Sequence, residues 1–355
     1  MDNWTVQEVV SQYQKEITSW RAEGLGRGRC RKKIMEMSGR VCTDGCMQRV
    51  FQILNKRMQN ISIEEEQIDD GEVPLQELIE NKLKASERKK KKFQLHNRTL
   101  TLPAQPFGLL IFGDPHIDND GCDFATLSEH VRLAQTTEGV LCATVGDIND
   151  NWVGRLSQEY AKSSILATDG WRLSEWFLNS AQWIAVVGGN HDLWQNSTAG
   201  FDPLKMLSKT ASVQCYAPDE LRITLQFKSQ PEIDPIIWII RHDFSGRSWY
   251  HPTHGPHKEA MLDGQCHILT AGHIHQWGQL TTEQRHGRVT HAIRVRGYKQ
   301  SDGYAKTKGF FEQKYGMACL LVINPIANEP QKITVFWDIE SGCNYLSHLR
   351  QNNGN

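Results

Sequence analysis

From Phe107 onward, five short apolar runs are each followed by side chains that can bind a metal ion or move a proton. The runs begin at Phe107, Val140, Trp183, Pro235 and Cys266. In chain order, the side chains that follow them are Asp114 and His116, Asp147, Asn190 and His191, His242, and His273 and His275. Apolar runs of this length are typical of buried strands, and open α/β sheets bind ligands where the carboxyl ends of their strands meet. We therefore expect these side chains to share one site.

The donor types indicate which ions such a site would bind. Imidazoles mixed with carboxylates and one amide oxygen suit a borderline transition metal better than Ca²⁺ or Mg²⁺ alone. Four histidines, two aspartates and one asparagine are enough donors for two ions if one aspartate bridges them. Two ions about 3.5–4 Å apart can clamp a phosphate during in-line displacement and activate the attacking water. We expect two divalent ions, with manganese as the first choice and iron, zinc, cobalt or nickel as alternatives.

Five motifs in this region resemble those of a known family. In chain order, GDPHID, GDIND, GNHD, RHD and GHIH are similar to the motif series of calcineurin-like metallophosphoesterases, over roughly residues 107–340. The resemblance implies an α/β fold in which a two-sheet β-sandwich is flanked by helices, in αββα layers. It also implies that Asp114, His116 and His275 hold one metal, that Asn190, His242 and His273 hold the other, and that Asp147 bridges them.

The resemblance gives His191 and Asp192 a different role. His191 would stand outside the metal ligands and protonate the leaving oxygen, and Asp192 would orient the imidazole ring. Chemistry supports the role of His191, because loss of an alkoxide is helped by a general acid and an imidazole beside two cations is positioned to act as one. The pair Gly188–Gly189 would let the backbone turn tightly beside the site.

His242 has competitors as a ligand, because His251, His254 and His257 follow it in WYHPTHGPHKEAM. We favour His242 because it directly follows an apolar strand, as the other expected ligands do. The three later histidines then belong to a solvated loop, and His254 and His257 are the candidates for contacts with substrate phosphate.

A second set of candidate substrate contacts lies after the strand-like run HAIRV. Arg296, Tyr298 and Lys299 could reach a phosphate or stack on a base. The alternative is that these residues are surface charge on a connecting loop.

Residues 1–60 are predicted to be helical and basic. Thr5 and Glu8 have the spacing of a capping box, and the segment from 20 to 60 holds ten basic residues against three acidic ones, a net charge of +7. A helix, a Ser-Gly turn and another helix have the outline of a helix-turn-helix, although Gly45 inside the last helix weakens the match. Arg29, Arg31, Lys32 and Lys33 are the candidate DNA contacts. The alternative is a solvated helical oligomerisation arm.

The remaining organisation follows from composition. We expect a charged linker over 61–105, the metallophosphoesterase domain over 106–340 and a tail over 341–355.

The nine cysteines are odd in number and scattered, which indicates free thiols in a reducing compartment, and Cys42 with Cys46 could at most be half a metal site. No signal peptide and no 18-residue apolar run is apparent. These features predict a cytoplasmic protein without membrane contacts, in a host cell's cytoplasm if the chain is phage-encoded.

The motifs narrow the substrate only in part. GDINDNW and GNHD differ from the GDxxDRG and GNHE of the family's protein serine/threonine phosphatases, because Asn151 stands where those have arginine. Purple acid phosphatases carry a tyrosine before the segment of the bridging metal ligand and are secreted, and neither feature is evident in this sequence. The basic N-terminal region favours DNA as substrate and a phage-type nuclease. One alternative is a phosphoesterase for a cyclic nucleotide or phosphomonoester, with the N-terminus used for assembly as a homo-oligomer. Another is a DNA-binding regulator whose catalytic domain is vestigial.

Overall fold

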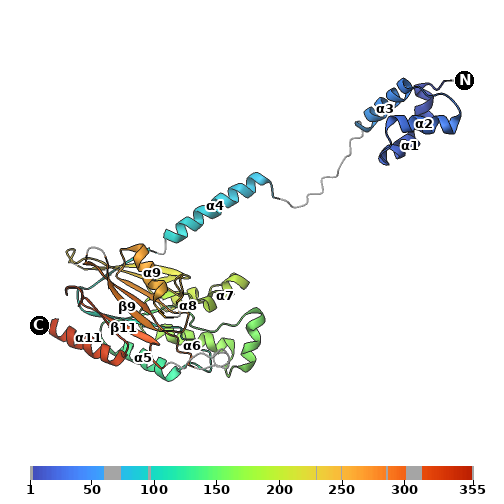
Figure 1. Ribbon diagram of the computed structural model, residues 1–355. Helices are drawn as coiled ribbons and strands as arrows, with labels where there is room; N and C mark the ends of the chain where they lie inside the picture. The colour runs from blue at the N-terminus through green and yellow to red at the C-terminus, as the bar shows by residue number, and fades with distance from the viewer. Residues whose placement is uncertain are drawn as a thin grey trace. The chain divides into compact units, whose positions relative to one another are not determined.

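The computed structural model describes residues 3–59, 73–94, 97–228, 230–248, 250–284, 287–300 and 314–353. The chain divides into two compact units, residues 1–81 and 82–355. Figure 1 shows the helices and strands of each unit. The acidic residues between 64 and 70, part of the predicted linker, lie outside the described residues.

The N-terminal unit contains the three helices predicted for it: α1 (Val6–Ala22), α2 (Arg27–Ser38) and α3 (Asp44–Gln59). Thr5 and Glu8 form the predicted capping box at the start of α1. Gly39 ends α2 in the left-handed conformation, with φ 66°, which glycine adopts without steric cost. Val9, Ile17, Ile34, Met47 and Val50 are fully buried between the helices, so the unit has an apolar core of its own.

The cysteines of this unit lie in its apolar core. Cys42 and Cys46 are free and buried in the core with Cys30. Among the described residues, none of the three belongs to a group of potential ligand atoms.

A long helix, α4 (Leu75–Gln94), precedes the sheets of the second unit. These are two six-stranded sheets. The first has the order β1 (Asn97–Leu102), β6 (Glu220–Phe227), β7 (Ile236–Arg241), β8 (Ile268–Ala271), β10 (Val289–Arg294), β9 (Gly278–Glu283). The second has the order β12 (Ile333–Phe336), β11 (Ala318–Ile323), β2 (Phe107–Phe112), β3 (Val140–Thr144), β4 (Trp183–Val187), β5 (Tyr216–Ala217). All five strands predicted to carry ligands are present.

Buried side chains on both faces of the sheets define four layers. Ile111 and Val187 of the second sheet and Leu225, Trp238 and Ile240 of the first share one apolar core between the sheets. The outer face of the second sheet is covered by α5 (Phe124–Thr136), α6 (Ala167–Asn179), α8 (Pro203–Thr210) and α11 (Ile339–Asn353). The outer face of the first sheet carries α9 (His254–Asp263). The predicted αββα sandwich is therefore confirmed.

The predicted domain limits were wrong at both ends. The linker was drawn to residue 105, but β1 lies inside that range and pairs with β6 in parallel, with Asn97 opposite Arg222. Its residues alternate between exposed and half-buried, the period of a strand with one face on a core. The predicted tail forms most of α11, whose Cys343 and Leu346 are buried against the second sheet. The lysine run of ERKKKKFQ, inside the range predicted as linker, lies in the last turns of α4.

No helix in the described part of the chain is long and apolar enough to cross a membrane.

Candidate metal centre

The loops after five strands bring the predicted ligands together. β2, β3 and β4 are parallel neighbours in one sheet, and β7 and β8 are parallel neighbours in the other. Their carboxyl ends carry all seven side chains predicted as ligands. Asn190 also begins a short helix, α7 (Asn190–Ala199). Parallel pairing within each sheet explains why residues so far apart in the chain meet at one edge.

The first group of potential ligands consists of Asp114, His116 and His275. His275 Nε2 lies 3.4 Å from Asp114 Oδ2 and 3.3 Å from His116 Nε2. This is the set that the family resemblance implied for one metal.

The second group consists of Asp147, His242 and His273. His242 Nε2 lies 3.2 Å from Asp147 Oδ2 and 3.0 Å from His273 Nδ1. Asn190 Oδ1 is 3.0 Å from the same His242 nitrogen. The other His242 nitrogen, Nδ1, lies 2.9 Å from the Val145 carbonyl oxygen, which turns Nε2 towards the group. The four side chains proposed around the second metal are therefore neighbours.

These donors fit divalent metal ions. Ligand nitrogens point at one another at 3.0 and 3.3 Å, and their lone pairs repel unless a cation or proton lies between them. Asp114 Oδ1 is buried and has no hydrogen-bond partner. A nitrogen-rich set with carboxylates matches a borderline transition metal. When bound, two such ions would neutralise charge on a phosphate and lower the pKa of a water molecule.

Charge is concentrated in this buried site. Burial raises the pKa of Asp114 to about 6. Burial also opposes ionisation of Asp147, but the imidazole of His242 outweighs it and holds the Asp147 pKa well below its usual range. Burial disfavours the charged form of His242, yet Asp147 and then Asp114 raise its pKa to about 10. The carboxylates therefore depend on nearby positive charge, which metal ions would supply.

Four of the predicted ligands have strained backbone. The φ angles of His116, Asp147, His273 and His275 are 42°, 50°, 71° and 50°. A non-glycine residue in this region costs on the order of 1–3 kcal/mol when the surroundings enforce it. Such strain gathers at functional sites, because the fold must turn these side chains towards a common centre.

Glycines let the loops of the site approach one another. A Cβ at Gly189 would lie 2.0 Å from Asp147 Oδ1 and 2.4 Å from the Asp147 amide nitrogen. A Cβ at Gly272 would lie 2.2 Å from Asp114 Oδ1. We predicted that the Gly188–Gly189 pair permits a tight turn, but neither has a positive φ. What Gly189 provides is space for the loop that carries Asp147.

His191 stands beside these two groups and forms a third group of potential ligand atoms with His116 and Asp150. Its Nε2 lies 4.0 Å from Asp147 Oδ2, and its amide donates to Asp147 Oδ1 at 2.9 Å. Its Nδ1 lies 2.7 Å from the carbonyl oxygen of Asp150. That contact leaves Nε2 as the nitrogen that faces the site. Burial lowers the pKa of His191.

The role predicted for Asp192 was wrong. Its carboxylate accepts hydrogen bonds from the backbone amides of Asp147 at 2.7 Å, Ile148 at 3.2 Å and Gly189 at 2.8 Å. The His191 ring is oriented by the Asp150 carbonyl instead. Adjacent residues at the start of a helix point in different directions, so neighbours in sequence need not be partners. Asp192 ties the Asp147 loop to the start of α7.

Asp150 orients a ligand. Its Oδ1 lies 2.8 Å from His116 Nδ1, leaving His116 Nε2 for the metal group. Burial lowers the pKa of His116, but the Asp150 contact outweighs it and raises that pKa to about 8. A carboxylate behind a metal-binding histidine fixes its ring and increases its basicity.

The residues predicted as substrate contacts after HAIRV have three different surroundings. Lys299 reaches the site, with Nζ 3.7 Å from Asp150 Oδ1. Arg296 is 3 % exposed and Nε donates to the Tyr315 carbonyl at 3.1 Å, so it is not loop surface charge. Tyr298 is fully buried with its hydroxyl 2.7 Å from His130 Nδ1, so the idea that it stacks on a base was wrong.

Of the three later histidines, His251 is exposed and precedes α9 as expected, whereas His254 and His257 lie in that helix and not in a solvated loop. His254 is the exposed first residue of α9, and His257 is half-buried within that helix. In the described part of the chain, neither histidine belongs to a group of potential ligand atoms.

Sequence reasoning missed three side chains around the site. The Arg247 guanidinium is exposed and lies 3.3 Å from His273 Nε2. The rings of Trp152 and Trp194 lie 5.3 and 4.1 Å from the His191 ring. Both tryptophans directly follow motifs, in GDINDNW and GNHDLW, and Arg247 is five residues after His242. Proximity to the motifs was the only signal.

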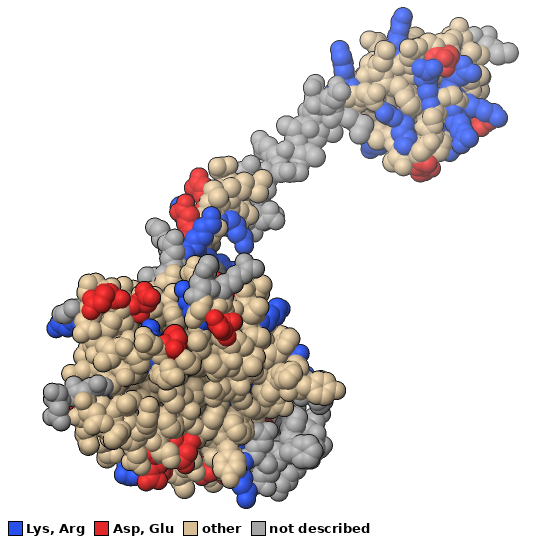
Figure 2. Space-filling view, turned by 60° about the vertical axis from the view of Figure 1, so that its left-hand side comes forward, with Lys and Arg blue, Asp and Glu red and all other residues tan. Residues whose placement is uncertain are grey.

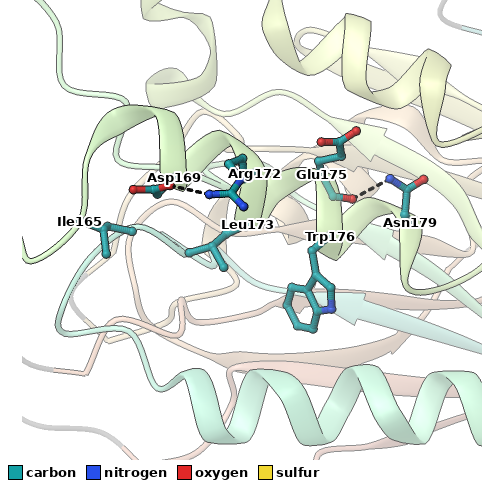
Figure 3. Close-up of a pocket in the computed structure, with 7 residues that line it drawn as sticks. All are labelled: Ile165, Asp169, Arg172, Leu173, Glu175, Trp176 and Asn179. Carbon is teal, nitrogen blue, oxygen red and sulfur yellow. Dashed lines mark hydrogen bonds and ion pairs between the residues drawn. The ribbon is translucent and has the colours of Figure 1, made fainter.

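A hollow lies on α6. It has a volume of about 570 Å³ and is lined by Ile165, Asp169, Arg172, Leu173, Glu175, Trp176 and Asn179 (Figure 3). Among the described residues, none of these side chains belongs to a group of potential metal ligands. The hollow holds no chemistry that would compete with the metal centre.

Comparisons with known proteins find similarity to several solved structures. Vps29 from Chaetomium thermophilum is 13 % identical, with a TM-score of 0.33, over 65 % of this chain and 95 % of that one. A single mutant of Vps29 from Entamoeba histolytica is 12 % identical, with a TM-score of 0.34, over 65 % and 97 %. The nuclease MPE from Pseudomonas putida is 14 % identical, with a TM-score of 0.28, over 64 % and 86 %. No family model and no curated protein matches the sequence.

At these identities and TM-scores the neighbours do not indicate a substrate. The layered sheets and the ligand groups at their strand ends are those that the resemblance to calcineurin-like metallophosphoesterases implies.

Proposed function

We propose that this protein is a metal-dependent phosphodiesterase that cleaves DNA, with manganese as the first-choice metal. The observation that carries the proposal is the meeting of all seven predicted ligands beside His191. Each metal would have three donors of its own and share Asp147. Such a pair of ions suits in-line displacement at phosphorus.

His191 and Arg247 suit the two ends of the reaction. The contact of His191 Nδ1 with the Asp150 carbonyl directs Nε2 towards the site, where the ring, when protonated on both nitrogens, can give the Nε2 proton to the leaving oxygen and become neutral. The Arg247 guanidinium next to His273 can hold a phosphate oxygen. Lys299 adds a further positive charge near Asp150. Attack by water and departure of the alcohol would therefore both be assisted.

DNA is proposed because of the N-terminal unit. Arg29 and Lys32 of α2 are exposed, and Arg31 and Lys33 are half-buried. Basic side chains are spread over this unit (Figure 2). Lys33 Nζ lies 5.0 Å from the Trp20 ring, and Lys32 Nζ lies 3.9 Å from Glu36 Oε1. Such a surface would neutralise DNA phosphates and raise the local substrate concentration.

The test is a metal-screened assay of the purified chain on bis-p-nitrophenyl phosphate, plasmid DNA and single-stranded DNA. Manganese-dependent cleavage of the diester and of at least one DNA supports the proposal. Hydrolysis of the diester without cleavage of any DNA would indicate a phosphodiesterase that acts on a substrate other than DNA. Inactivity towards every phosphoester with every metal would contradict the catalytic proposal.

A second candidate is a small-substrate phosphoesterase whose N-terminal region serves assembly. Helix α4 favours it, because Leu75, Leu78, Ile79 and Leu83 are 73, 47, 45 and 61 % exposed and repeat at helical spacing. Apolar side chains in such a row commonly pack against another helix. The oligomeric state and the DNA assay together distinguish the two candidates.

A further inference from the structure

Two tryptophans and a histidine form a cluster at the metal centre. Trp152 follows the Asp147 loop, and Trp194 lies one turn after His191 on α7. The ring centroids of Trp152 and Trp194 are 5.9 Å apart with planes inclined by 33°. Trp194 lies 4.1 Å from the His191 ring at an inclination of 35°. Both tryptophans are partly exposed, so part of each ring is open to solvent or substrate.

The cluster is held in place from behind. Asn151, with a left-handed φ of 44°, donates from Nδ2 to the His191 carbonyl at 2.7 Å. Gln195 Nε2 donates to Asn151 Oδ1 at 3.0 Å. These bonds tie the loop before Trp152 to the helix that carries Trp194. The spacing of the two rings is therefore set before any substrate binds.

We propose that Trp152 and Trp194 form an aromatic platform that stacks on the base of the leaving nucleoside. The inference rests on the proposed phosphodiesterase function and adds the substrate feature that this site recognises. Exposed tryptophan faces bind nucleobases with little regard to sequence. Because His191 is the proposed proton donor to the leaving oxygen, a base held beside His191 belongs to the product that leaves.

A nearby cation fits this use of the platform. Lys299 Nζ lies 5.7 Å from the Trp152 ring centroid and 3.7 Å from Asp150 Oδ1. A positive charge at the edge of a stacking surface can hold the sugar–phosphate backbone that accompanies a base. Packing of His191 alone would require neither partial exposure of two tryptophans nor a cation beside them.

The test compares dinucleotides in which one base is missing. The substrates are dTpdT and two analogues, each with thymine absent from one of the two sugars, assayed with Mn²⁺. Product analysis identifies the leaving nucleoside as the one released without phosphate. Loss of its thymine should lower kcat/KM on the order of 5- to 100-fold, the range expected for one base–aromatic stack. Loss of the other thymine should have a much smaller effect.

Variants separate stacking from support of His191. In Trp152→Leu and Trp194→Leu, the kcat/KM ratio between dTpdT and the leaving-side abasic analogue should fall towards one. In Trp152→Phe this kcat/KM ratio should lie between the value of Trp152→Leu and the wild-type value, because phenylalanine keeps an aromatic face. Trp176→Leu is the matched control. Trp176 lies on α6 (Figure 3) and is 38 % exposed, and its ring centroid is 5.5 Å from that of Phe124, so its aromatic neighbour is Phe124 and not His191. That variant should keep the wild-type ratio.

Three results would overturn the inference. A wild-type ratio near one excludes base stacking on the leaving side. Equal losses on both substrates in the leucine variants, with the ratio kept, mean that the tryptophans act only through His191. Cleavage of bis-p-nitrophenyl phosphate without cleavage of any dinucleotide would contradict the proposed platform but would still support the phosphodiesterase activity. Failure to hydrolyse any phosphodiester contradicts the proposed function itself.

Discussion

Asp147 is the residue on which the two proposed metal positions depend. It shares a ligand group with His242 and His273, and its other oxygen accepts the His191 amide at 2.9 Å. Metal analysis of the wild-type protein should find close to two transition ions per chain, and EDTA should abolish turnover. Asp147→Asn should lose both ions, because an amide binds these metals more weakly than a carboxylate. Full occupancy in that variant would exclude the bridging assignment.

His191 should affect the chemistry without holding the metals. His191→Ala should retain both ions, yet lose about 10²–10⁴-fold in rate on a diester with a poor leaving group. With p-nitrophenolate as leaving group the loss should be much smaller, since that anion needs little protonation. Steady-state rates on the two substrates, together with metal analysis, measure this. Equal losses on both would argue that His191 is not the acid.

The loop between β4 and α7 acts at the scale of elements, because Gly189 lets it touch the Asp147 loop. Gly189→Ala would place a Cβ 2.0 Å from Asp147 Oδ1, so the loops must move apart. We expect loss of metal and a lower melting temperature, measured by metal analysis and thermal unfolding. The matched control is Gly278→Ala, where the nearest atom would be an ordinary 3.6 Å away. Similar behaviour of the two variants would contradict the close-approach explanation.

Helix α11 should be part of the folded sandwich. Leu346 is fully buried against the second sheet, so Leu346→Ala should lower the free energy of unfolding by about 2–5 kcal/mol. Asn344→Ala, at an exposed position of the same helix, should change it by less than about 0.5 kcal/mol. Denaturant titration measures both. If Leu346→Ala were neutral, the segment would be the dispensable tail that composition predicted.

At the scale of the whole molecule, the two units should separate catalysis from DNA affinity. A chain beginning at Lys82 keeps β1 and every proposed ligand, so it should hydrolyse bis-p-nitrophenyl phosphate at the full-length rate. Its affinity for duplex DNA should fall. If the lost surface touches four phosphates, the slope of log K against log[salt] should flatten by roughly 3 to 4, at about 0.9 per phosphate.

Two further measurements complete this experiment. Replacing Arg29, Arg31, Lys32 and Lys33 with alanine should reproduce part of the loss in the full-length chain, without changing hydrolysis of the small diester. If the shortened chain instead binds and cuts DNA normally but changes its mass by light scattering, the N-terminal unit is an assembly arm. The small-substrate candidate would then take first place.

Features that depend on short-range pattern could be predicted from the sequence alone. Each predicted ligand directly follows an apolar run, and a buried strand ends where its apolar run ends, so His242 could be preferred over three neighbouring histidines. The Thr5–Glu8 box and Gly39 likewise marked helix ends, because capping requires only residues a few positions apart.

Which side chains meet across the chain could not be predicted from the sequence, because folding brings distant residues together. Asp192 is beside His191 in sequence but bonds to amides of the Asp147 loop, while Asp150, forty-one positions away, orients the His191 ring. Arg247 and the two tryptophans lie near motifs but belong to no motif. The sequence also did not show that β1 and α11 belong to the sandwich, because the strands that they pair with or pack against are distant in the chain. Local spacing fixes the periodicity of an element, whereas the contacts of its side chains depend on what the fold brings opposite.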